Sequence, residues 1–393
     1  MSRRRTSAIR LAAVFFAAAF VVRPAQAYQL KTESGFFDAG GSKIWYEVCG
    51  SGTPVVLLHD GLLHSVSWNH VLAPLCAEYR VLRYDRRGYG RSEAAKSPYS
   101  AIEDLRLAMR QVKIDRAIIV GCSAGGGLAL DFAIAQPEMV KGLLLIGPAV
   151  GGMTASDFFR ERNQRNDAPE KSGDLKAVAR NWSNDPYIIA GTHDAARKEI
   201  YDLLVENPQD LKGSGPAISL QPPALARLRG VEAPTLVIVG SADIADVQAN
   251  TGAIEAAMPV VQREVWADTG HLIQMEQPDR LVKRLEAFVK TVERPEIALT
   301  PAQRAEFAGR YKIGNQEISI LEQNGRLMIR VPGNMDWRLF AASDSRLFLR
   351  APATEIEFTR NAAGAITQMI IFDGENRIPC PKVAGAPGGT DAR

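Results

Sequence analysis

The feature that most constrains this sequence is the pentapeptide Gly-Cys-Ser-Ala-Gly at residues 121–125, between two apolar segments. Residues 117–120 are Ala-Ile-Ile-Val and predict a buried strand, whereas residues 125–135 predict a helix. A serine in such a strand–turn–helix junction is held in a tight turn with its hydroxyl projecting from the sheet edge. The motif alone is weak, because Gly and Ser are common in loops, and its place after a buried strand is what gives it weight. It predicts a sheet that presents Ser123 as a nucleophile.

Short apolar strands alternate with amphipathic helices from residue 40 to residue 295. Several of the strands are continuous Val/Ile/Leu runs, which is typical of strands buried on both faces of a parallel sheet. This alternation predicts an α/β fold with a mostly parallel central sheet and helices on both faces. The predicted strands cover 44–48, 55–58, 81–84, 117–120, 142–146, 236–239 and 264–266, and the predicted helices cover 67–78, 100–113, 125–135, 247–258 and 278–290.

One interval interrupts this alternation. The roughly ninety residues between 146 and 236 carry no clear strand, are polar and helix-prone in patches, and contain several prolines. We expect a helical insertion over about residues 150–232 that lies across one edge of the sheet.

After residue 295 the alternation stops, and Pro295, Thr300 and Pro301 predict a linker. Beyond it, the Asn324-Gly325 pair between two apolar runs is the strongest short hairpin signal available. The predicted hairpin strands cover 317–322, 327–331, 355–359 and 367–372. The predicted domains are an α/β domain at 28–296, a small all-β domain at 300–383 and a flexible tail at 384–393.

A serine hydroxyl is a poor nucleophile unless a base removes its proton during attack. The chain has five histidines. His271 follows the last predicted strand of the α/β region and precedes a helix. Because loops at the carboxyl ends of parallel strands carry functional groups in such sheets, we expect His271 to be the base. His59 ends an apolar strand, and we expect it to be structural.

The base needs a carboxylate that fixes its tautomer and stabilises the imidazolium. Asp243 follows the predicted strand 236–239 and is our candidate, with Asp246, three residues later, as the alternative. The chain order Ser123, Asp243, His271 is the order expected for a nucleophile on this kind of turn.

Acyl transfer also needs donors for the developing oxyanion, and the loss of one donor typically costs on the order of 3 kcal/mol. The N–H of Ala124 follows from the turn geometry. A second donor must come from the loop after strand 55–58, where we predict Gly61, with Leu62 as the alternative. A carboxylate close to an oxyanion would oppose catalysis, so we expect the side chain of Asp60 to point away.

These segments resemble the α/β-hydrolase superfamily over residues 40–295. The resemblance implies the α/β-hydrolase fold, a cap at about 150–232 that shapes the substrate pocket, and a Ser123–His271–Asp243 triad. Ser123 stands where the haloalkane dehalogenase and epoxide hydrolase branches have Asp, which disfavours both. The family usually has His-Gly where this chain has His59-Asp60, with the glycine moved to position 61. The motifs that carry the resemblance are Val55-Val-Leu-Leu-His59 with Trp68, Tyr84-Asp-Arg-Arg-Gly-Tyr-Gly-Arg-Ser92, residues 121–125, Val237-Ile-Val-Gly-Ser-Ala-Asp243, and Gly270-His271 followed by Glu276-Gln-Pro278.

The C-terminal segment resembles a small β-barrel-like domain that is often appended to secreted serine hydrolases of the β-lactamase-like group. Its motifs are Phe307-Ala-Gly-Arg-Tyr311, Glu355-Ile-Glu-Phe358 and Ile378-Pro379. The segment contains no histidine, so we do not expect it to assemble a catalytic set.

The N-terminus predicts a signal peptide over residues 1–27. It has a basic start at Arg3–Arg5, an apolar run at 11–22 and an Ala-Gln-Ala cleavage site before Tyr28. A membrane span needs about 20 apolar residues, so this run is too short to be one. We therefore expect an exported protein, periplasmic or secreted, with cleavage after Ala27 and no membrane span.

The formal net charge of +3 comes from this N-terminus. Residues 1–27 hold five arginines and no acidic residue or lysine, so the remainder has 42 basic against 44 acidic groups. That balance gives no reason to expect a nucleic-acid partner.

The four cysteines form no CxxC pair, so no metal site is expected. An oxidising compartment would permit a disulfide, and Cys49–Cys76 is the most plausible pair, although the sequence alone predicts no bridge. We expect Cys122 to be a small buried residue.

Together these features predict a carboxylesterase-like serine hydrolase. It would act on an ester, thioester or lactone bond, or on an amide bond, of a small molecule, without a cofactor. The alternatives are a ligand-binding or sensor protein that keeps the fold without turnover, and a C–C hydrolase or aminopeptidase branch. The sequence determines neither the substrate nor the oligomeric state.

Overall fold

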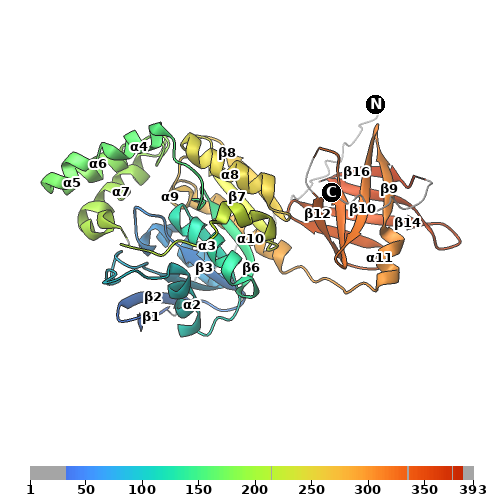
Figure 1. The fold of residues 1–393 in the computed structure, drawn as a ribbon, viewed down its shortest axis with the longest axis horizontal. Coiled ribbons are helices and arrows are strands. Elements are labelled where there is room, and N and C mark those ends of the chain that lie inside the picture. The colour runs from blue at the N-terminus through green and yellow to red at the C-terminus, as the bar shows by residue number, and fades with distance from the viewer. Residues whose placement is uncertain (1–31, 214, 334–335, 374, 384–393) are drawn as a thin grey trace, which may run out of the picture.

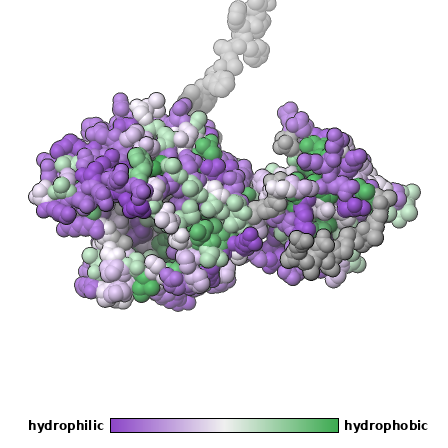
Figure 2. Space-filling view, turned by 45° about the horizontal axis from the view of Figure 1, so that its top comes forward, coloured by the Kyte–Doolittle hydropathy of each residue, from purple (hydrophilic) through white to green (hydrophobic). Residues whose placement is uncertain are grey.

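The computed structural model describes residues 32–213, 215–333, 336–373 and 375–383. They form a larger α/β domain and a smaller all-β domain, joined by a single connecting segment (Figure 1). In the space-filling view the two domains are separate lobes, and the larger lobe carries an extensive hydrophilic area on the face in view (Figure 2). The predicted signal peptide at 1–27 and the predicted tail at 384–393 lie outside the described residues. No helix of the described chain is long and apolar enough to cross a membrane.

The central sheet has eight strands in the order β1-β2-β4-β3-β5-β6-β7-β8. From β4 to β8 all neighbouring strands are parallel, and β1 and β2 are antiparallel additions at one edge. The predicted mostly parallel α/β sheet is confirmed, whereas β1 was missed because only one of its residues, Phe37, is buried. The strands are β1 Thr32–Asp38, β2 Lys43–Cys49, β3 Pro54–Leu58, β4 Arg80–Tyr84, β5 Ala117–Cys122, β6 Val140–Ile146, β7 Thr235–Gly240 and β8 Val261–Trp266.

Helices cover both faces of this sheet, as predicted. Buried side chains of α2, α3 and α8 pack in one apolar cluster with one set of strand side chains. Those of α1 and α10 pack with the alternate set on the opposite face. The helices of this domain are η1 Ser65–Trp68, α1 Asn69–Glu78, α2 Ala101–Gln111, α3 Ala124–Ala135, η2 Pro137–Met139, α8 Ala245–Ala257, α9 Ile273–Glu276 and α10 Pro278–Val292, where η marks a 3-10 helix.

Between β6 and β7 the described residues form helices and no named strand. We call this segment the cap. Its helices α6 and α7 contribute Ala179, Ile200 and Leu204 to the cluster that also holds α1 and α10, so the cap shares a core with the sheet domain. The helices are α4 Asp157–Gln164, α5 Asp167–Ser172, α6 Leu175–Ser183, α7 Asp194–Glu206, η3 Pro208–Lys212 and η4 Ala224–Gly230.

The C-terminal domain is an eight-stranded antiparallel meander in the order β16 to β9. A bridge between Tyr311 and Lys382 joins its first and last strands, which nearly closes a barrel. Thr300 and Pro301, predicted as linker, instead start a helix, because Thr300 and Gln303 form a reciprocal capping box. The elements are α11 Pro301–Phe307, β9 Gly309–Ile313, β10 Gln316–Gln323, β11 Arg326–Arg330, β12 Asp336–Ala341, β13 Arg346–Arg350, β14 Ala353–Arg360, β15 Ile366–Asp373 and β16 Asn376–Pro381.

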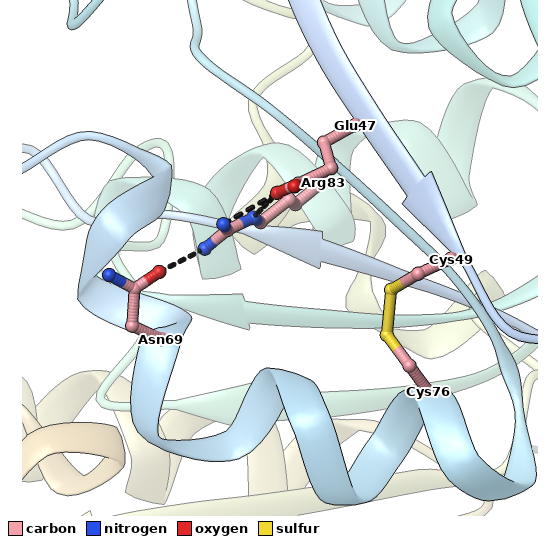
Figure 3. The surroundings of a disulfide bond; sticks show 5 residues. All are labelled: Glu47, Cys49, Asn69, Cys76 and Arg83. Atoms are coloured by element: carbon pink, nitrogen blue, oxygen red, sulfur yellow. Dashed lines mark hydrogen bonds and ion pairs between the residues drawn. A yellow bond between two sulfur atoms is a disulfide. The ribbon is translucent and has the colours of Figure 1, made fainter. Parts of the chain in front are cut away.

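A disulfide joins Cys49 at the end of β2 to Cys76 in α1 (Figure 3). Beside it, the Arg83 guanidinium of β4 donates to Glu47 Oε2 at 2.6 Å and to Asn69 Oδ1 at 2.6 Å. One cation and one covalent bond therefore tie β2, β4 and α1 together. The other two cysteines, Cys122 and Cys380, are free and buried.

We expect the double substitution Cys49→Ala/Cys76→Ala to lower the free energy of unfolding by about 3.5 kcal/mol. The reason is that the bond closes a loop of 27 residues and so restricts the unfolded chain. Urea unfolding with and without a reductant measures this. The reductant should lower the stability of the wild type toward that of the double variant and leave the variant unchanged. A wild type that is insensitive to full reduction would contradict the assignment.

Candidate active site

Ser123 occupies the turn between β5 and α3 in a strained conformation. Its φ is 54° and its ψ is −117°, backbone angles that a residue other than glycine rarely adopts. Three backbone hydrogen bonds hold it: its N–H donates to Ile146 O at 2.8 Å, and its carbonyl accepts from Gly127 at 2.9 Å and Ala149 at 3.0 Å. Such strain persists only where the surroundings over-determine it, and it is typical of functional sites.

Glycine at position 125 lets α3 approach the sheet. A Cβ there would lie 2.3 Å from Leu58 O and 2.4 Å from His59 O, which are backbone atoms at the end of β3. Any side chain would push the helix away from the sheet. The second glycine of the pentapeptide thus brings the start of α3 against the loop that follows β3.

His271 lies in the loop after β8 and is hydrogen-bonded to Asp243. The distance from His271 Nδ1 to Asp243 Oδ2 is 2.7 Å, and both side chains are buried. Asp246, the alternative acid, is half-buried and accepts instead from Ser156 N and Ser156 Oγ at 2.6 and 2.7 Å. The structure therefore pairs His271 with Asp243 and not with Asp246.

Opposing effects set the pKa of His271. Burial lowers it, whereas the charge of Asp243 and the hydrogen bond to it raise it, and the net pKa lies above the ordinary value. The loop itself is held by Glu276, whose two carboxylate oxygens accept from Ala190 N and Gly270 N at 2.7 Å each. The imidazole is thus positioned from two sides, by Asp243 and by the Glu276-bound loop.

Gly147, at the end of β6, is a site residue that sequence reasoning missed. Its φ is +46°, and a Cβ there would lie 3.0 Å from both Asp243 Oδ2 and His271 Nδ1. The hydrogen-bonded pair therefore fits only against a glycine. The available signal was a glycine directly after a buried strand that neighbours the Ser123 strand.

The two predicted oxyanion donors lie next to each other. Ala124 is the first residue of α3, and the N–H groups of a first helical turn have no partner within the helix. A Cβ on Gly61 would lie 3.5 Å from that of Ala124, so the two residues are neighbours. Leu62, the alternative donor, uses its N–H on Asp60 Oδ1 at 2.7 Å. Gly61 therefore remains the predicted donor from this loop.

His59 is structural, as its position at a strand end predicts. Its Nε2 accepts from Arg86 N at 2.9 Å, so its Nδ1 carries the proton and donates to Asp60 O at 2.8 Å. Burial, together with the nearby charge of Arg86, lowers its pKa well below the ordinary value. Through its hydrogen bond to Asp60 O, this neutral imidazole holds the backbone at Asp60, next to Gly61.

A cavity of about 930 Å³ joins these residues, which is within the range of small-molecule sites. Ser123, His271, Asp243, Asp60 and Gly61 all line it, and the cap and α8 supply most of the rest. Among the described residues no cluster of His, Cys, Asp and Glu side chains could hold a metal ion. The remaining lining is mainly apolar and aromatic, with Leu62, Val150, Met153, Phe158, Phe159, Trp182, Tyr187, Ile188, Ile244, Val247 and Leu272.

The sequence of this chain is similar to those of known proteins. Residues 55–284 match the model of the alpha/beta hydrolase family. The chain is 26% identical over 277 residues to an uncharacterised protein of Mycobacterium tuberculosis, covering 63% of this chain and 78% of that one. It is 27% identical over 231 residues to 3-oxoadipate enol-lactonase 1 of Acinetobacter baylyi, covering 58% and 84%.

A solved structure shares the fold of the larger domain. A thermophilic esterase from Thermogutta terrifontis superposes with a TM-score of 0.57 at 22% identity, covering 66% of this chain and 99% of that one. This likeness concerns the fold alone.

We expect Asp243→Asn to lower the pKa of His271, because it removes the charge that raises this pKa against the effect of burial. The matched control is Asp246→Asn, which changes a carboxylate three residues away that is bound to Ser156. NMR titration of the His271 ring protons measures both. An equal shift in the two variants would contradict the pairing seen in the structure.

Proposed function

The chain belongs to the alpha/beta hydrolase family, and we propose that it is a serine hydrolase that cleaves an ester-type bond of a small molecule. The observation that carries the proposal is the 2.7 Å pair of His271 and Asp243 in a cavity that Ser123 also lines. A nucleophile, a base and a carboxylate that orients the base are the parts that acyl transfer needs.

In the proposed reaction, Ser123 Oγ attacks the substrate carbonyl carbon while His271 takes the serine proton. Asp243 holds the imidazole by Nδ1, which leaves Nε2 as the nitrogen that accepts this proton. The carbonyl oxygen becomes an oxyanion beside the N–H groups of Ala124 and Gly61. When the intermediate collapses, His271 returns the proton to the leaving group, and water releases the acyl group in a second, equivalent cycle.

The substrate class that the cavity favours is an ester, thioester or lactone with an apolar acyl part. Its lining is mainly apolar, and the cap adds aromatic rings from Phe158, Phe159, Trp182 and Tyr187. The relative from Acinetobacter baylyi is named as a lactonase, which is consistent with this bond class. Amide, C–C bond and sensor alternatives are outcomes of the tests below.

We also propose that the protein is exported, to the periplasm or the medium, after removal of residues 1–27. The sequence of that segment carries this proposal, and the Cys49–Cys76 disulfide is consistent with an oxidising compartment.

An alkyl fluorophosphonate should label Ser123, because a serine activated by a base attacks the phosphorus atom and becomes phosphonylated. Mass spectrometry of the digested protein locates the label. Ser123→Ala should abolish labelling and lower ester turnover by at least about three orders of magnitude. The substrate panel is p-nitrophenyl acyl esters of rising chain length, beside lactones and aminoacyl amides. A folded protein that is not labelled and turns over none of them would favour the sensor alternative.

Expression with the full N-terminus in a bacterium with two membranes should yield a mature chain that begins at Tyr28. N-terminal sequencing of the periplasmic fraction measures this. The control replaces Ala25 and Ala27 by bulky residues, which should block cleavage because signal peptidase sites require small residues there. Unprocessed protein confined to the cytoplasm would rule out export.

A further inference from the structure

The group at the site that the proposed mechanism leaves unused is the carboxyl of Asp60. Asp60 stands between His59 and Gly61 and lines the same cavity as Ser123. It is 1% exposed. A buried carboxylate beside a forming oxyanion would oppose the reaction, so its presence here needs an explanation.

The two oxygens of Asp60 differ in their surroundings. Oδ1 accepts from Leu62 N at 2.7 Å and from Leu63 N at 2.9 Å, and so shapes the loop that presents Gly61. Oδ2 is buried and has no hydrogen-bond partner among the described residues. A buried polar atom without a partner is costly, and such exceptions are candidates for catalytic roles. Oδ2 is therefore the oxygen that would carry a proton if the carboxyl of Asp60 is neutral.

Few positive charges stabilise the ionised carboxylate of Asp60. Burial raises the pKa of its carboxyl, while its two backbone hydrogen bonds and the charges of His271 and Arg86 lower it, and the net effect is upward. The Arg86 guanidinium donates to the backbone carbonyl of Asp60, not to its carboxyl. The other titratable neighbours, Tyr89 and Cys122, become anionic when they ionise, so they do not stabilise a carboxylate.

The reaction itself adds a second negative charge near this carboxyl. Two like charges repel more strongly in a buried site than in water, because the effective dielectric constant is lower there. An oxyanion at the Ala124 and Gly61 N–H groups therefore favours the protonated form of Asp60, whereas the proton that His271 takes in the same step favours the ionised form. A substrate that fills the cavity excludes water and acts in the same direction as the oxyanion.

We propose that Asp60 is a catalytic residue that acts as a neutral carboxylic acid, its Oδ2–H donating a hydrogen bond to the oxyanion. This role rests on the proposed hydrolase function. The proton remains on Asp60 throughout: Ser123 loses its proton to His271, the carbonyl oxygen takes the electron pair, and Asp60 adds a third donor to Ala124 and Gly61. Activity then requires Asp60 protonated and His271 neutral.

This requirement predicts the form of the pH profile. In the wild type, kcat/KM should be bell-shaped in pH, because the required form, with His271 neutral and Asp60 protonated, is lost on both sides of the optimum. Asp60→Asn keeps an acceptor for Leu62 and Leu63 and supplies an N–H donor that does not titrate. It should therefore abolish the alkaline fall, with less than about a tenfold loss of kcat at the optimum. Asp60→Ala should lose about 10²- to 10³-fold in kcat, as for a missing oxyanion donor.

The experiment measures these profiles with a p-nitrophenyl ester and the affinity for an alkyl trifluoromethyl ketone, which adds Ser123 to form a tetrahedral oxyanion. Asp60→Ala should weaken ketone binding far more than it raises KM. The matched control is Asp131→Asn, which changes a carboxyl on α3 outside the cavity whose pKa burial raises to about 6. It should keep the wild-type profile. Thermal unfolding of each variant tests folding, and Asp60→Asn carries the result if Asp60→Ala is unfolded.

A wild-type profile without an alkaline fall, or the same fall in Asp60→Asn, overturns the proposal. So does an Asp60→Asn variant that loses all activity while the wild-type profile stays flat, because the ionised carboxylate would then be the active form. If Ser123 is labelled by the fluorophosphonate and esters are hydrolysed, these outcomes refute only the role of Asp60. If Ser123 is neither labelled nor needed for turnover, the hydrolase function fails as well.

Discussion

The arrangement of the site depends on one close approach of backbone to backbone. The start of α3 lies so near the end of β3 that a Cβ at position 125 would be 2.3 Å from Leu58 O. This contact fixes the turn in which Ser123 is strained, and it brings Ala124 against Gly61. Ser123, Ala124 and Gly61 are thus positioned by the packing of a helix on a sheet, which is more rigid than a loop.

The carboxyl ends of the parallel strands supply the rest of the site in the same way. Ser123 follows β5, Gly147 follows β6, Asp243 follows β7 and His271 follows β8. Since neighbouring parallel strands end at one edge, residues far apart in sequence meet without any long connection. The cap then closes the cavity over this edge. Its Asp185 is buried and pairs with both Arg162, which lines the cavity, and Arg165.

How much of this the sequence could predict follows from what each pattern depends on. The parallel strands and their helices were predictable because continuous burial leaves a continuous apolar run, as in β7. Strand β1 was not, since it pairs at an edge and only Phe37 of its seven residues is buried. Strands β9, β12, β13 and β16 were missed because short half-buried strands in a barrel leave weak alternation. Thr300 was misassigned because a capping box and a linker share the same residue types.

The residues of the candidate site were likewise predictable only in part. Ser123, Asp243 and His271 could be proposed from their places after strands. Their hydrogen bonds could not be predicted, because the choice between Asp243 and Asp246 as the partner of His271 depends on where Ser156 of the cap lies. Leu62 could be set aside as a donor only from the structure, in which its N–H donates to Asp60 Oδ1.

The Cys49–Cys76 bond encloses β3 and the whole loop that carries Asp60 and Gly61. A single proteolytic cut in that loop would therefore leave two fragments that the disulfide still joins covalently, although the loop itself was severed.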